Sequence, residues 1–304
     1  MLSSKEIKKL RMHDPFISGK NQSYFVTGYF PLEKLKQFLP EKMSIPSDEV
    51  MAKEYPTVGK INGMHPILLL FSRCYHVHDV ITKIEIRPYL ELLFYFPVVY
   101  THLGEARLCS YLPVLYLDFL IGTLGGMFLG LRKQFHPGLK YIETETANTF
   151  ILKDIINANF QQTPTENNKE LNSFFTQIFN KPTVTVSYFN QTVFYTASVQ
   201  PTKVLDASAD YKWNYKGTTI KNNEQTFANY CEYSFTTSWA MGYEKYFHPK
   251  YPMNEMYRAI NKEVKRKSQT KLHPTRLCRE QSGRFLSILI IAKQFSRQHR
   301  QAGE

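Results

Sequence analysis

The segment from 111 to 131, YLPVLYLDFLIGTLGGMFLGL, constrains the fold most, because its only charged residue is Asp118. About 20 apolar residues are long enough for a helix that spans a bilayer. However, a carboxylate in mid-span costs a few kcal/mol, and Pro113 and four glycines weaken a continuous helix. No other stretch is comparably apolar. The segment therefore fits better as a buried strand up to Leu117, a turn near Asp118 and a Gly-rich buried helix.

Strand-like apolar runs recur along most of the chain. The chain holds 22 Phe and 20 Tyr, and aromatic side chains suit a pleated, half-buried surface. Pro31 and the following LEKLKQFL predict a short helix that ends at Pro40. The predicted strands cover residues 24–30, 67–71, 80–87, 90–100, 107–117, 147–154, 183–188 and 193–199. This spacing predicts an α+β fold that is mostly β, with an antiparallel barrel or curved sheet and flanking helices.

The distribution of charge and turn residues divides the chain into three parts. The formal net charge is +12, and residues 262–304 hold eleven Lys or Arg against three acidic residues. After Gly217, the polar stretch TTIKNNEQ indicates a boundary. We expect a domain over residues 1–216, an extension over 217–261 that packs on or completes it, and a mobile basic tail over 262–304.

The basic tail indicates the kind of partner, and the cysteines indicate the cellular compartment. An anionic membrane surface or a polyanion would suit the tail, although its apolar island at 285–292 is too short to span a bilayer. There is no specific nucleic-acid motif. The four cysteines form no C-x-x-C pair, and the first residues have no apolar signal core. We therefore expect a cytoplasmic protein with reduced thiols.

Several segments, taken in order, resemble the acetoacetate decarboxylase superfamily. Residues 21–45, NQSYFVTGYFPLEKLKQFLPEKMSI, resemble its opening strand, short helix and Leu-Pro-Glu turn. Residues 88–100, PYLELLFYFPVVY, are similar to a family strand with a glutamate six residues before a proline, here Glu91 and Pro97. Residues 111–118 resemble the family strand that closes on Leu-Asp. The resemblance covers about residues 15–215.

This resemblance implies a fold, a cavity and a kind of ligand. The family fold is a cone-shaped antiparallel barrel with flanking helices and an apolar internal cavity. It uses no metal or organic cofactor, and its members are often oligomers. We therefore expect a small carbonyl compound, keto acid or other carboxylic acid as ligand, and a homo-oligomer as the assembly.

The family nucleophile is a lysine that forms a Schiff base with a keto acid, and the stretch GMFLGLRKQF stands in its place. Gly126 matches the family pattern, while Met127 and Phe128 replace an Arg-Glu pair. A one-residue gap before Gly130 puts Lys133 in the nucleophile's position and Gln134 in that of its neighbour. Without the gap, Gln134 takes the nucleophile's position and no lysine does.

Lysine chemistry at this site depends on its pKa. A free lysine titrates near ~10.4, so burial must lower the pKa before the amine can attack a carbonyl. Arg132 could add to this shift if it faces the same cavity. Glu91 could orient substrate or move a proton. Phe30, which stands where the family has an arginine, is expected to line the pocket together with Tyr89 and Tyr116.

Interpretations in which Lys133 is not a catalytic residue stay open. The chain could be a noncatalytic binding member that keeps the cavity and lacks the decarboxylase chemistry. In that case Arg132 and Lys133 could simply end a buried helix, where cations complement the carbonyl end of the dipole. His76 and His78 would share one face of a regular strand, but two imidazoles do not make a metal site. No G-x-S-x-G, Walker or dinucleotide motif is present.

Overall fold

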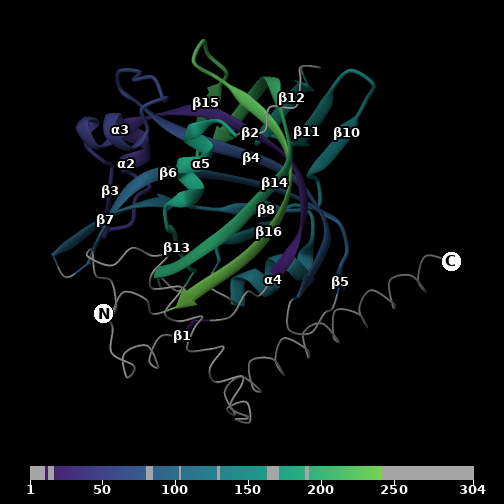
Figure 1. Cartoon of the computed structure of the whole chain (residues 1–304), viewed down its shortest axis with the longest axis horizontal. Helices are drawn as coiled ribbons and strands as arrows, with labels where there is room; N and C mark the ends of the chain where they lie inside the picture. The colour runs from purple at the N-terminus through teal and green to yellow at the C-terminus, as the bar shows by residue number, and fades with distance from the viewer. Residues whose placement is uncertain are drawn as a thin grey trace, which may run out of the picture.

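The computed structural model describes residues 11–12, 17–79, 85–102, 104–128, 131–162, 171–188 and 192–241. It is mostly β, as the sequence predicts (Figure 1). The helices are α2 (Leu32–Lys36), α3 (Asp48–Glu54), α4 (Leu120–Phe128) and α5 (Ser173–Asn180). The strands are β1 (Arg11–Met12), β2 (Ile17–Pro31), β3 (Met43–Ser44), β4 (Met64–Asp79), β5 (Glu85–Ile86), β6 (Tyr89–His102), β7 (Glu105–Tyr111), β8 (Leu115–Leu117), β9 (Lys133–Phe135), β10 (Lys140–Glu143), β11 (Asn148–Leu152), β12 (Ile156–Gln162), β13 (Thr183–Val186), β14 (Thr192–Tyr215), β15 (Thr218–Lys221) and β16 (Ala228–Met241).

All of these strands belong to one strongly curved sheet. Its main path is β1-β16-β2-β4-β6-β7-β13-β14-β12-β11-β10, and β7–β13 and β8–β9 are its parallel pairs. The long strand β14 also pairs with β16, so the sheet curls back on itself (Figure 1). Within the described ranges the whole sheet is not closed into a barrel, because β1 and β10 remain at its edges. Of the two expected architectures, the curved sheet is therefore the one observed.

The alternation of side chains along the strands gives the sheet two buried faces. We call one the Trp213 face, whose buried residues include Val26, Phe94, Tyr116 and Trp213. We call the other the α5 face, whose buried residues include Leu70, Leu93, Leu115 and Cys231. Phe174, Phe175 and Ile178 of α5 pack into the core of this second face. Each long strand therefore contributes to two separate cores.

The apolar segment at 111–131 divides as the sequence predicts. β8 is buried and ends at Leu117, and α4 begins two residues after Asp118. Asp118 holds the turn, since its Oδ1 accepts a hydrogen bond of 2.8 Å from the backbone N–H of Leu90. The helix is not buried all round, because Leu120 and Leu124 are 47% and 36% exposed. Among the described residues, none of the helices has the length and apolar character that a membrane crossing requires.

The segment after residue 217 forms part of the same sheet. β15 pairs with the end of β14, and β16 lies between β2 and β14 with 24 described pairings to the two. The described part of this segment, up to Met241, thus belongs to the sheet, and the division of the chain into three parts stays a prediction. The basic tail at 262–304 lies outside the described residues, so its contact with an anionic surface stays a prediction. The cytoplasmic location and the homo-oligomer also remain predictions.

Candidate active site

The strand register places Lys133 and Glu91 on the α5 face. Lys133 opens β9 opposite Leu115 of β8, which in turn lies opposite Leu93 of β6. Glu91 precedes Leu93 by two residues on β6, so its side chain leaves the sheet on the same side. On the other edge of β6, Glu91 lies opposite Ser72 of β4. Lys133 and Glu91 therefore occupy neighbouring rungs of one face.

The side chain of Lys133 is enclosed, with only 9% of the residue exposed. Its aliphatic chain lies against Gly126 of α4, where a methyl group would overlap Cδ and Cε and approach Nζ to 3.0 Å. Its backbone carbonyl accepts a hydrogen bond of 2.9 Å from the Tyr188 hydroxyl. The absence of a side chain at Gly126 thus leaves room for a lysine beneath the helix.

Three further titratable side chains surround this lysine on the α5 face. The Cys74 thiol donates a hydrogen bond of 3.7 Å to Oε2 of the partly buried Glu91. Cys74 is 1% exposed and lies opposite Tyr89 across the β4–β6 pair. Lys133, Glu91, Cys74 and Tyr89 consequently form one polar cluster within an apolar surrounding.

Burial dominates the titration of this cluster. It lowers the pKa of the Lys133 ammonium from its ordinary value, while the charges of Glu91 and Cys74 oppose that shift. Burial also raises the pKa of the Glu91 carboxyl, against the opposing effects of Lys133 and Cys74. The pKa of the Cys74 thiol is well above its usual range for the same reason. The lowered pKa of Lys133 favours the neutral amine, and the raised pKa of Glu91 suits a group that can donate a proton.

The structure separates Arg132 from Lys133, which corrects the expected tuning role of the arginine. Arg132 directly precedes β9, where the backbone turns, since the N–H of Lys133 donates a hydrogen bond of 3.0 Å to the carbonyl of Leu131. Its guanidinium lies 5.4 Å from the Tyr188 ring centroid. Burial raises the pKa of Tyr215 on the Trp213 face, and the charge of Arg132 opposes that rise. Burial lowers the pKa of Lys133, and Arg132 is not among the groups that shift this pKa.

The alternative interpretation of Lys133 as the end of a helix is also wrong. α4 ends at Phe128, and Lys133 begins a strand. Gln134, the other candidate for the nucleophile's position, is exposed and lies opposite Tyr116 of β8. Lys133 is thus the residue of this pair that lies on the α5 face with Glu91.

Of the three expected pocket-lining aromatics, only Tyr89 lies on the α5 face. Phe30 is fully buried in the Trp213 face, with its ring centroid 6.1 Å from that of Trp213. Tyr116 is in the same core and contacts the ring of His136 at a centroid distance of 5.2 Å. Phe30 and Tyr116 therefore lie on the face opposite to Lys133, because side chains alternate between the two faces of a strand and sequence order alone does not show which face holds the lysine.

Sequence reasoning missed a group of buried polar residues on the same face. Tyr233 of β16 accepts hydrogen bonds from Asn21 Nδ2 at 2.9 Å and from Ser23 Oγ at 3.2 Å. The hydroxyls of Ser23 and Ser72 are 2.7 Å apart. All four residues are at most 5% exposed. The alternation of small polar residues in Asn21-x-Ser23 and Ser72-x-Cys74, within otherwise apolar strands, was the available signal.

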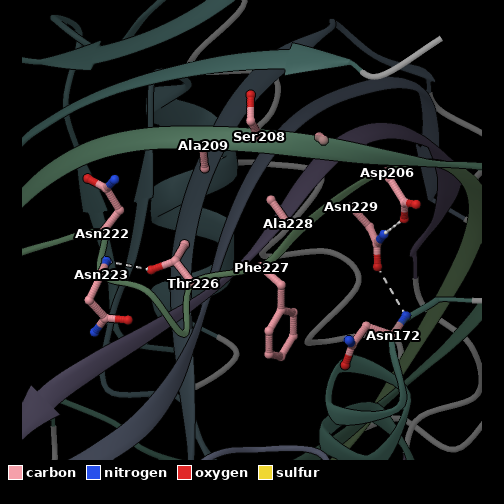
Figure 2. A pocket seen from close by; sticks show the side chains of 11 residues that line it. Asn172, Asp206, Ser208, Ala209, Asn222, Asn223, Thr226, Phe227, Ala228 and Asn229 are labelled. Atoms are coloured by element: carbon pink, nitrogen blue, oxygen red, sulfur yellow. Dashed lines mark hydrogen bonds between the residues drawn. The ribbon is translucent and has the colours of Figure 1, made fainter. Parts of the chain in front are cut away.

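A hollow with a volume of 410 Å³ lies elsewhere, along β14 and the loop before β16 (Figure 2). Its wall is rich in amide side chains, including Asn172, Asn222, Asn223 and Asn229. Asn229 is engaged within the wall, because its Nδ2 donates to Asp206 at 3.0 Å and its Oδ1 accepts from the Asn172 N–H at 3.0 Å. The hollow contains none of the residues of the lysine cluster.

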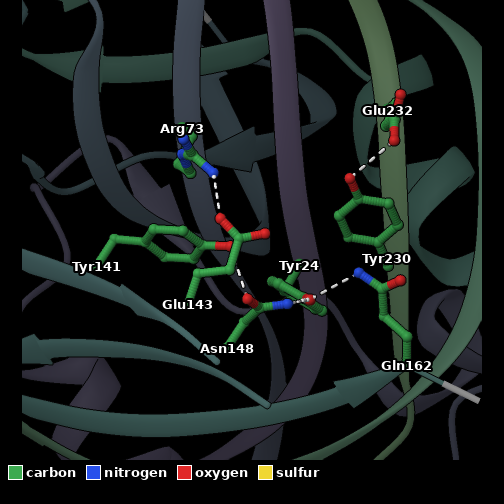
Figure 3. Close-up of polar contacts among 8 residues, drawn as sticks. All are labelled: Tyr24, Arg73, Tyr141, Glu143, Asn148, Gln162, Tyr230 and Glu232. Atoms are coloured by element: carbon green, nitrogen blue, oxygen red, sulfur yellow. Dashed lines mark hydrogen bonds and ion pairs between the residues drawn. The ribbon is translucent and has the colours of Figure 1, made fainter. Parts of the chain in front are cut away.

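A second polar network joins the β10–β11–β12 part of the sheet to β2 and β4 (Figure 3). The Tyr24 hydroxyl accepts hydrogen bonds from Asn148 at 2.6 Å and from Gln162 at 3.0 Å. Arg73 pairs with Glu143 at 3.2 Å across the same region. Apart from the contact between Tyr230 and Glu232 within β16, the dashed contacts in Figure 3 link residues of different strands, so this network holds the strands together.

The two histidines of the sequence His76-Val77-His78 do not build a metal site in the described part of the chain. His76 has a left-handed φ of 49°, which interrupts the regular alternation of β4, and its Nδ1 lies 3.6 Å from Glu85. Among the described residues, there is no group of three or more His, Cys, Asp or Glu suited to hold a metal ion.

Comparisons with known proteins identify the fold. Neither protein-family models nor curated proteins match the chain. The structure is similar to the acetoacetate decarboxylase of Legionella pneumophila subsp. pneumophila str. Philadelphia 1, with a TM-score of 0.52 and 13% identity over 76% of this chain and 88% of that chain. It is also similar to the enduracididine biosynthesis enzyme MppR with HEPES buffer bound, with a TM-score of 0.50 and 10% identity over 76% of this chain and 87% of that one.

A further MppR structure is complexed with the condensation product of pyruvate and imidazole 4-carboxaldehyde. It matches with a TM-score of 0.50 and 10% identity, over 75% of this chain and 88% of that chain. The chain therefore has the acetoacetate decarboxylase-like fold that its sequence resemblance implies.

Proposed function

We propose that this protein binds a small carbonyl compound or keto acid on the α5 face and forms a Schiff base with it through Lys133. The observation that carries the proposal is the enclosed Lys133 beside Glu91, with an amine whose pKa is lowered by burial. A neutral amine is the form that attacks a carbonyl carbon. The complex of the similar MppR structure with a condensation product of pyruvate supports a carbonyl ligand.

The chemistry requires one proton donor beside the amine. Nζ forms a bond to the carbonyl carbon, and the carbonyl oxygen leaves as water after it takes protons. Glu91, whose pKa is raised by burial, is placed to donate one of them as a general acid. In a β-keto acid the resulting iminium accepts the electron pair of the breaking C–C bond, and carbon dioxide leaves. The enamine then takes a proton on carbon, and water releases the product and restores Lys133.

A noncatalytic binding protein is the second candidate, and the position of Arg132 favours it. The arginine faces the Trp213 side, so a second cation that could depress the lysine pKa is missing from the described residues near Nζ. Such a protein would hold the carbonyl compound without forming the covalent bond.

Borohydride trapping distinguishes these two candidates. The full-length protein is incubated with acetoacetate and a panel of small keto acids and ketones, treated with sodium borohydride, and analysed by peptide mass spectrometry. A reduced adduct on Lys133 supports the Schiff-base function. Binding without any adduct in folded protein supports the noncatalytic candidate.

Glu91→Gln is expected to shift the pH profile of trapping to lower pH. The Glu91 charge raises the pKa of Lys133, so its removal lowers that pKa and leaves the amine neutral at more acidic pH. The maximal rate should also fall, because the amide cannot donate the proton as an acid does. The trapping rate is measured between pH 5 and pH 10, with the exposed Glu143→Gln as control. An unchanged midpoint would contradict the assigned role of Glu91.

Gly126→Ala is expected to slow trapping by about 100-fold without destabilising the fold. The new methyl group would displace the Lys133 side chain, and a misplacement of about 1 Å can cost this much in rate. In contrast, Ala gains up to about 1 kcal/mol over Gly in a helix. Gly122→Ala in the same helix is the matched control, since its methyl would meet Phe119, which lies just before α4, and not Lys133. Equal trapping rates in both variants would contradict the packing of Lys133 against Gly126.

A further inference from the structure

Two neighbouring rungs of the sheet carry an unusual number of polar side chains on the α5 face. One rung runs Tyr233–Asn21–Cys74–Tyr89 across β16, β2, β4 and β6. The next runs Cys231–Ser23–Ser72–Glu91 across the same strands. Side chains on adjacent positions of such rungs lie about 4.5 to 5.5 Å apart. The polar residues therefore form a continuous band that leads from Glu91 to Tyr233.

At the Tyr233 end of this band, one hydrogen-bond donor and one acceptor are not used by the hydrogen bonds of the described residues. A phenol oxygen has two acceptor positions and one donor, and Tyr233 accepts from both Asn21 and Ser23. Its own O–H is therefore left to donate. Asn21 is 5% exposed, and its Oδ1 is buried without a hydrogen-bond partner among the described residues. One donor and one acceptor thus lie side by side in a buried position.

We propose that Asn21 and Tyr233 form a subsite for a hydroxyl group of the substrate. A hydroxyl can donate to Asn21 Oδ1 and accept from the Tyr233 O–H at the same time. A carboxylate could only accept, and an ammonium could only donate, so either would leave one of the two groups unpaired.

The inference rests on the proposed function for the other end of the ligand. Cys74 connects the two ends, because it lies opposite Asn21 on β2 and its thiol donates to Glu91. The carbonyl would lie at Lys133 and the hydroxyl at Tyr233, with a short carbon chain between them. The substrate class is therefore a small hydroxyketone or hydroxyaldehyde.

The test compares 4-hydroxy-2-butanone with 2-pentanone, which has a methyl group in place of the hydroxyl. Noncovalent affinity for the full-length protein is measured by ligand-observed NMR. We expect wild type to bind the hydroxyketone about tenfold more tightly, because the ketone leaves two buried polar groups unpaired. Tyr233→Phe and Asn21→Leu should each reduce this ratio to near one. Tyr230→Phe is the matched control, because Tyr230 lies on the same strand but faces the Trp213 side.

The results of these experiments distinguish the hydroxyl subsite from Schiff-base formation at Lys133. Equal affinities in wild type, or an unchanged ratio in a folded Tyr233→Phe or Asn21→Leu variant, would overturn the subsite. Borohydride trapping separates this failure from that of the proposed function. Adducts on Lys133 that form equally well from both ketones would support the Schiff base and count against the subsite. A hydroxyl preference without any adduct would support the subsite and count against the Schiff base.

Discussion

Lys133→Ala is expected to abolish the borohydride-trapped adduct. Exposed lysines titrate near ~10.4, so roughly one in a few thousand is neutral at pH 7. Lys133 differs because it is only 9% exposed and burial lowers its pKa. We therefore expect adduct formation at Lys133 to exceed that at other lysines by about 100-fold or more, and to disappear with its amine. The readout is the adduct mass and its position in the peptide map.

Two controls make this result specific. Lys140→Ala removes an exposed lysine from β10, seven residues further along, and should leave the adduct unchanged. Lys133→Arg keeps a cation at the site but removes the nucleophilic amine, so it should also lose the adduct. An adduct of wild-type intensity in folded Lys133→Ala, mapped to another lysine, would show that Lys133 is not the nucleophile.

Trp213→Ala is expected to destabilise the protein by about 3–5 kcal/mol, the usual cost of truncating a buried aromatic. Trp213 is 1% exposed and lies at the centre of the Trp213 face. Its ring centroid is 4.5 Å from that of Phe94 and 5.3 Å from that of Tyr215. The small side chain would leave a cavity where β6 and β14 meet. Urea denaturation measures the change in the free energy of unfolding.

Two further substitutions test whether the destabilisation by Trp213→Ala is caused by lost packing. Lys212→Ala alters the exposed residue before Trp213 and should change stability by no more than about 0.5 kcal/mol. Trp213→Phe keeps most of the ring and removes an indole N–H that is buried without a hydrogen-bond partner in the described residues. It should therefore cost clearly less than alanine. A loss of similar size in Trp213→Phe and Trp213→Ala would contradict an effect dominated by cavity volume.

The class of fold and the order of its elements could be predicted from the amino-acid sequence. Aromatic, alternating runs predicted a mostly β chain, because such residues suit a pleated surface with buried faces. The single carboxylate, the proline and the glycines in residues 111–131 predicted the division into β8 and α4. Collinear segments around Glu91 and the stretch ending in Lys133 indicated the fold that the comparisons confirm.

The side chains that share the site could not be predicted in this way, because they come together through long-range strand pairing. A strand points successive residues to opposite faces, and a shift of one residue exchanges those faces. This is why Lys133 lies on the α5 face, whereas Phe30 lies on the Trp213 face. The subsite at Asn21 and Tyr233 joins residues 212 positions apart, and only the pairing of β16 with β2 brings them together. Local patterns specify strands, but long-range register, set by the packing of both faces, specifies the site.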